Sequence, residues 1–112
     1  MTGKPFPFPY RGPEALRRPI HDALRRVLDP EVAINIVDVG LVYGVAVTDT
    51  ELQGLLTMTS AACPLAGLIV EDIETELERD LPPGLSIKID LVWEPPWTNE
   101  RMSDSAKRRM GW

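Results

Sequence analysis

The apolar residues change their spacing at Cys63-Pro64 and again at Pro82-Pro83-Gly84, and these two changes restrict the fold more than any other feature of the chain. Upstream of the first change the apolar residues alternate with others, as in a half-buried strand, at Leu52, Leu56 and Met58. Between the changes they repeat at the spacing of one helix face, at Leu65, Leu68, Ile69, Ile73 and Leu77. After the second change they alternate again, at Leu85, Ile87, Ile89, Leu91 and Trp93. A strand, a helix and a strand in this order can form a crossover unit, which is right-handed where the strands are parallel in one sheet.

Further elements flank this unit. Helical spacing from Pro19 onward predicts a first helix that ends near Leu28, before Pro30. Alternation over residues 41–47, followed by a polar turn, predicts an antiparallel hairpin. After Trp93, a proline pair ends the last strand, and Thr98 and Ser103 can cap short helical turns. We therefore predict an α/β (α+β) fold in the order helix, strand, strand, helix, strand, helix, with a small mixed three-stranded sheet, helices packed on one face and a short helical tail.

The length of 112 residues fits one domain. We predict that residues 1–13 form a separate N-terminal arm, because prolines alternate there with aromatic residues and favour an extended conformation. Aromatic side chains are costly to leave in water, so this arm is expected to dock on its own core or on a neighbouring subunit. The alternative is a disordered terminus. Residues 14–112 then form the single domain.

Composition narrows the class of protein. A net charge of −5 argues against a nucleic-acid partner, which would require a concentrated basic surface. The single cysteine rules out an internal disulfide framework and fits a reducing compartment. The sequence contains neither a recognisable signal peptide nor a long apolar run, so we expect a cytoplasmic protein with no membrane span and no membrane partner.

Cys63 stands where the alternating pattern gives way to the helical one, and Pro64 fits the first position of a helix. A thiol at a helix N-terminus is favoured as the thiolate, which is the form that binds soft metals and attacks electrophiles. We expect this thiol to be at least partly accessible and to titrate below an ordinary cysteine. The alternative is a small, buried, structural cysteine.

Several oxygen-bearing side chains could join this thiol in a site. They are Asp29, Glu31 and Asp38 from one loop, Thr59 and Ser60 before the cysteine, and Glu94 at a strand end. A hydroxyl could donate a hydrogen bond to a thiolate or a cluster sulfide, and a carboxylate could accept a proton or bind a hard metal. Loop capping is the alternative for each acid. His21 has no metal-ligand spacing with another residue and is expected to be a surface histidine.

The sequence resembles a small family of metal-sulfur cluster assembly factors that includes SufT and the PaaD-like proteins. The resemblance covers residues 15–112 and lies in four motifs, which are Asp29-Pro30-Glu31, residues 35–43, Met58-Thr59 to Cys63-Pro64, and Trp93-Glu94-Pro95-Pro96-Trp97-Thr98 with the following residues 100–103. It implies a small α/β protein and places the family's site residues on Asp29, Glu31, Thr59 and Cys63. Ser60 stands where many relatives have a second threonine and retains a hydroxyl. The extra C-terminal cysteines of some PaaD-like relatives are absent, which argues against a role specific to phenylacetate degradation.

The resemblance implies a factor for iron-sulfur cluster assembly or maturation whose partners are assembly proteins and apo-client proteins. We expect it to carry an iron-sulfur cluster or iron transiently through Cys63, as a homodimer or in a client complex, without turnover of its own. One alternative is an adaptor that binds client and assembly proteins while Cys63 is structural. A thiol enzyme ranks last, because no base accompanies the cysteine in the sequence.

Overall fold

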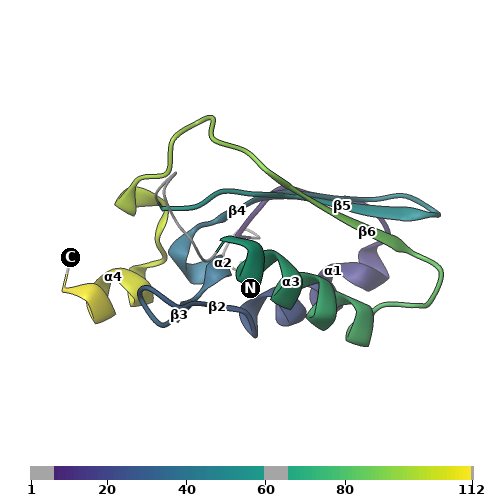
Figure 1. Cartoon of the computed structure of the whole chain (residues 1–112), viewed down its shortest axis with the longest axis horizontal. Helices are drawn as coiled ribbons and strands as arrows, with labels where there is room; N and C mark the ends of the chain where they lie inside the picture. The colour runs from purple at the N-terminus through teal and green to yellow at the C-terminus, as the bar shows by residue number, and fades with distance from the viewer. Residues whose placement is uncertain (1–6, 60–65, 112) are drawn as a thin grey trace, which may run out of the picture.

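The computed structural model describes residues 7–59 and 66–111 and contains a sheet with helices on one face (Figure 1). The sheet has four strands in the order β1 (Tyr10–Arg11), β4 (Val42–Val47), β5 (Glu51–Leu56) and β6 (Ser86–Leu91). Helices α1 (Glu14–Arg25) and α3 (Ala66–Asp80) lie side by side beneath it. The predicted α/β class is confirmed, whereas the predicted count of three strands is wrong, because the chain contributes a further strand before the first helix.

The hairpin and the crossover both form as the spacing of apolar residues predicts. Strands β4 and β5 are antiparallel, with Val47 opposite Leu52. Strands β5 and β6 are parallel, with Leu52 opposite Ile87, and α3 connects them. The inward face of the hairpin packs with the apolar stripe of α3, where Ile69, Ile73 and Leu77 are each 1% exposed. Local periodicity therefore predicts these elements correctly, because each buries one apolar face.

The additional strand comes from the segment predicted to be an arm. Tyr10 pairs in parallel with Val45, whose N–H donates to the Pro9 carbonyl at 3.0 Å. Phe8 is 3% exposed and belongs to the core. A two-residue strand between prolines has too few positions to establish an alternating pattern, so only packing against β4 defines it. The boundary after residue 13 stays a prediction.

The first helix starts and ends earlier than predicted. It begins at Glu14 and includes Pro19, and it ends at Arg25 rather than near Leu28. After it the chain turns through i to i−3 hydrogen bonds at Arg26 and Val27, so Val27 stays buried while Leu28 is 53% exposed. Leu28 starts β2 (Leu28–Asp29), which pairs with β3 (Ile34–Asn35) in a second, small sheet. Helical spacing alone does not reveal this end, because a tight turn can keep the next apolar residue on the same side.

Arg26 compensates the acidic end of α3. Its guanidinium donates to Glu76 at 2.7 Å and to Asp80 at 2.5 Å, and these hydrogen bonds raise the pKa of Arg26. The two carboxylates lie near the negative end of the α3 dipole, so a cation is favourable there. Neither α3 nor any other helix in the described ranges is long and apolar enough to cross a membrane.

The C-terminal segment contains a 3-10 helix η1 (Asn99–Arg101) and α4 (Asp104–Met110). Ser103 caps α4 as predicted, since its side chain accepts from the Ala106 N–H at 3.2 Å. Thr98 precedes η1 without a side-chain capping bond. Met102 and Ala106 are buried in the core, so this tail packs onto the domain.

Candidate functional site

The loop after α1 holds two of the predicted site carboxylates in different environments. Asp29 is 2% exposed, and its Oδ1 accepts a hydrogen bond from the Glu31 N–H at 2.9 Å. The Asp29 carbonyl accepts from the Ala33 N–H at 2.7 Å, and Ala33 has a φ of 58°. This closed turn presents the Glu31 side chain to solvent. The buried Asp29 therefore stabilises the turn through its hydrogen bond to the Glu31 N–H. The exposed Glu31 is the carboxylate that a ligand can reach.

Burial raises the pKa of Asp29, because desolvation disfavours the charged carboxylate. The hydrogen bond from the Glu31 N–H opposes this shift, and the nearby Glu31 carboxylate adds to it. A carboxyl group with a raised pKa is typical of sites that move protons, and also of buried structural acids.

Asp38, the third predicted carboxylate of this region, is held by Asn35 and Arg25 and lines a different cavity from Glu31. It lies in the short helix α2 (Ile36–Val39), where its N–H donates to Asn35 Oδ1 at 2.9 Å. Its Oδ2 accepts from Asn35 Nδ2 at 2.8 Å and from the Arg25 guanidinium at 3.3 Å. Asn35 therefore caps α2, and the Asp38 carboxylate links this turn to Arg25 of α1. This is a structural role, as in the loop-capping alternative for this acid, although the cap itself is Asn35.

The end of α2 and the start of β4 contact the C-terminal segment. Gly40 ends the helix with a φ of 87°, and its Cα approaches the backbone of Arg101 so closely that no side chain fits. The Trp97 indole Nε1 donates to the Val39 carbonyl at 2.8 Å. The Arg101 guanidinium lies 4.1 Å from the centre of the Tyr43 ring. These contacts place Trp97 and Met102 beside α2.

The loop, the strand end and the tail enclose one depression of about 230 Å³, lined by Glu31, Val32, Val39, Thr59, Trp97 and Met102. Glu31 and Thr59 are thus brought together although they are distant in sequence, and Asp29 lies under the same loop. Asp38 faces a different cavity. Glu94 is exposed after β6 and does not line the depression. Ser60 and Cys63 lie outside the described residues.

Two further residues of the depression, Trp97 and Met102, were not among the predicted site residues. Trp97 and Met102 supply apolar walls, and Met102 also supplies a thioether, a soft if weak donor. The signal for Trp97 was its place in the Glu94-Pro95-Pro96-Trp97 motif, whereas nothing in the sequence placed Met102 beside Glu31. Across residues 7–59 and 66–111, no three His, Cys, Asp or Glu side chains are grouped to hold a metal ion.

Thr57 is a buried polar residue directly after β5. Alternation places it on the face opposite Leu56 and Met58, yet all three are buried, at 1%, 2% and 3% exposed. Strand β5 ends at Leu56, so the two-residue alternation does not continue. The Thr57 hydroxyl has no hydrogen-bond partner within the described part of the chain, and a buried hydroxyl without a partner is costly. Sequence reasoning missed this residue.

The raised pKa of Asp29 predicts how stability depends on pH. The folded protein holds the Asp29 proton more tightly than the unfolded chain, so this group stabilises the fold at low pH and the contribution is lost as pH rises above the unfolded pKa of about 4. We expect Asp29→Asn, which keeps an acceptor for Glu31, to be at least as stable as the wild type at pH 7 and to lose any advantage near pH 4.

Urea unfolding at the two pH values measures this difference. Asp49→Asn, in the exposed turn between β4 and β5, controls for the loss of one carboxylate. An equal loss of stability by Asp29→Asn at both pH values would show that the carboxylate acts through its hydrogen bonds rather than through its buried charge.

The chain is similar to known proteins of one family. The family described as iron-sulfur cluster assembly protein matches residues 17–91. The chain is 42% identical over 99 residues to the Fe-S protein maturation auxiliary factor YitW of Bacillus subtilis, covering 88% of this chain and 96% of the relative. It is 40% identical over 86 residues to the Fe-S protein maturation auxiliary factor SufT of Staphylococcus aureus, covering 76% and 97%.

A solved structure is similar over a comparable share of the chain. The domain of unknown function DUF59 from Bacillus anthracis superposes with a TM-score of 0.82 at 40% identity, over 88% of this chain and 93% of that structure. The family match over residues 17–91 includes the loop of Asp29 and Glu31 as well as strands β4, β5 and β6, so the similarity extends beyond a common arrangement of helices and strands.

Proposed function

The chain belongs to the iron-sulfur cluster assembly protein family, and from this premise we propose that it carries a cluster or iron transiently through Cys63 and delivers it to apo-client proteins. The names of its relatives support a role in the maturation of iron-sulfur proteins. The observation that carries the finer proposal is the depression that both Glu31 and Thr59 line, since Thr59 lies four residues before Cys63 in the chain.

The number of soft ligands favours transient carriage over storage. Iron-sulfur clusters are normally held by about four ligands, mostly thiolates, and this chain has a single cysteine. The remaining ligands must come from a second copy, a small thiol, oxygen donors or the client itself. A ligand set that depends on a partner releases the cluster when the partner changes.

Glu31 and Thr59 suit complementary roles at such a cargo. Glu31 is exposed at the rim and can accept the proton of an incoming thiol or bind iron as a hard donor. Thr59 can donate a hydrogen bond to a sulfide or thiolate. Asp29 positions Glu31 through the hydrogen bond to its N–H.

An adaptor role is the second candidate, and the exposed apolar side chains favour it. Leu68 on α3 is 56% exposed. Leu91 at the end of β6 is 39% exposed, and Trp93 just after this strand is 44% exposed. Partner proteins commonly bind large apolar side chains that remain exposed on a small domain. In this case the protein would bring client and assembly proteins together, and Cys63 would be structural.

Glu31→Gln tests the contribution of the depression. We expect it to slow anaerobic cluster transfer to an apo-ferredoxin acceptor by about fivefold or more, because it removes a proton acceptor and an anionic ligand. The free energy of unfolding should change by less than about 0.5 kcal/mol, since the side chain is exposed.

Glu78→Gln is the matched control, because Glu78 is an exposed carboxylate on α3 outside the depression. Equal transfer rates for the two variants and the wild type would remove Glu31 from the mechanism. A slow Glu31→Gln variant with unfolded or aggregated protein would instead indicate a structural role.

A further inference from the structure

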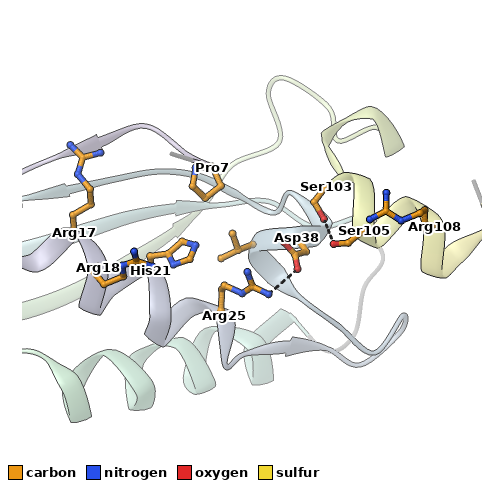
Figure 2. Close-up of a pocket in the computed structure, with 10 residues that line it drawn as sticks. Pro7, Arg17, Arg18, His21, Arg25, Asp38, Ser103, Ser105 and Arg108 are labelled. Atoms are coloured by element: carbon orange, nitrogen blue, oxygen red, sulfur yellow. Dashed lines mark hydrogen bonds and ion pairs between the residues drawn. The ribbon is translucent and has the colours of Figure 1, made fainter. Parts of the chain in front are cut away.

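A second and larger cavity, of about 490 Å³, lies between α1 and the C-terminal segment (Figure 2). Arginine side chains from α1 and α4 line it, together with His21, Asp38, and the hydroxyls of Ser103 and Ser105. Figure 2 shows the side chains of α1 along one wall and those of Asp38, Ser105 and Arg108 along the other. His21, expected to be a surface histidine, is 15% exposed in this wall.

The cavity concentrates positive charge on an acidic protein. Four arginines line it (Arg17, Arg18, Arg25 and Arg108) against a single carboxylate, Asp38, whereas the whole chain has a net charge of −5. Asp38 already accepts hydrogen bonds from Asn35 and Arg25. Arg17 is paired with Glu14 at 3.0 Å. The arginines that line the cavity therefore outnumber the carboxylates that pair with them.

Arg18 and Arg108 are the important pair. Neither guanidinium group makes a hydrogen bond or an ion pair with any residue in 7–59 or 66–111. They come from α1 and α4, at opposite ends of the sequence, and both border the same cavity. Arg18 and Arg108 lie on opposite sides of the cavity (Figure 2), and a bound anion would offset the positive charge that both sides present.

We propose that this cavity binds a small ligand through one or more phosphate groups. The planar guanidinium matches phosphate oxygens in a two-point contact, and the volume falls within the range of about 300–1,000 Å³ typical of small-molecule sites. The serine hydroxyls add neutral donors at the rim. A concave pocket of this size suits a compact anion better than an extended acidic peptide, which would need a longer groove.

The cavity shares structure with the candidate site but does not depend on its function. Asp38 of α2 lines the cavity, whereas the next residue, Val39, lines the depression. Likewise Ser103 lines the cavity and Met102 lines the depression. The Ser103 N–H donates to the Asp38 carbonyl at 2.8 Å, which joins the two segments. A bound anion would therefore contact the common wall, and its binding can be measured without any cluster.

Titration calorimetry with inorganic pyrophosphate tests the proposal, in about 0.15 M salt so that long-range attraction is screened to about 8 Å. We expect saturable binding of one pyrophosphate per chain. Arg18→Gln and Arg108→Gln should each weaken it by about tenfold, as expected for the loss of one charge-assisted contact. Arg109→Gln is the matched control, since Arg109 is exposed on α4 next to Arg108 and does not line the cavity.

NMR shifts on titration identify where the anion binds and so keep the test valid if a variant is unstable. Changes at Arg18, Asp38 and Ser103 to Ser105 support the proposal, and stronger binding of pyrophosphate than of citrate assigns the ligand to the phosphate class. Equal weakening by Arg109→Gln, or tighter binding of a poly-glutamate peptide than of pyrophosphate, would overturn it. The peptide result would favour an acidic partner segment instead.

Discussion

Replacing Cys63 by serine is expected to abolish cluster transfer. Anaerobic reconstitution of the wild type should produce a labile, substoichiometric chromophore that an apo-ferredoxin removes, and Cys63→Ser should produce none. The physical reason is that Cys63 is the single thiol of the chain, and a serine hydroxyl is neither soft nor readily deprotonated. Iron and sulfide analysis, with absorption spectra before and after addition of acceptor, measures the effect.

Far-UV circular dichroism and urea unfolding provide the control for this variant, because serine is close to cysteine in size. Full transfer by a folded Cys63→Ser protein would exclude carriage through the thiol and leave the adaptor role. The rate of alkylation against pH separates the same alternatives, since a structural cysteine would react only after denaturation.

The largest loss of stability is expected from Gly40→Ala. The backbone at Gly40 has a φ of 87°, which alanine adopts only with strain, and an added Cβ would overlap the backbone of Arg101. We expect the free energy of unfolding to fall by roughly 2–4 kcal/mol, with a decrease in Tm of about 10 °C or more. Thermal and urea unfolding measure both quantities.

Gly67→Ala is the matched control for Gly40→Ala. Gly67 lies in α3, and an added Cβ would meet no atom within 4 Å there. Because alanine favours a helix over glycine by roughly 0.5–1 kcal/mol, this variant should be as stable as the wild type or more so. A Gly40→Ala protein as stable as Gly67→Ala would mean that η1 can move away from α2 at little cost.

Much of the fold could be predicted from local sequence patterns. The hairpin and the crossover helix each carry an apolar face whose spacing is visible within a few residues. The motif Asp29-Pro30-Glu31 and the Trp97 motif likewise indicated the family, which the match over residues 17–91 supports. What these patterns share is that the sequence itself contains the whole signal.

The pairing of distant segments depended on the tertiary structure. Strand β1 exists because Tyr10 meets Val45, and α1 ends early because the chain turns into β2. The same holds for the site, because only packing decides that Glu31 and Thr59 line one depression while Asp38 accepts a hydrogen bond from Arg25.

Local sequence patterns were therefore enough to predict the order of the main elements, the family and the residues that can carry chemistry. The tertiary structure alone decided which of those residues meet, and it gathered Arg18 and Arg108 from opposite ends of an acidic chain into one cavity. The physical reason is that periodicity reports which face of an element is apolar, whereas contacts between distant side chains depend on how several such faces pack together.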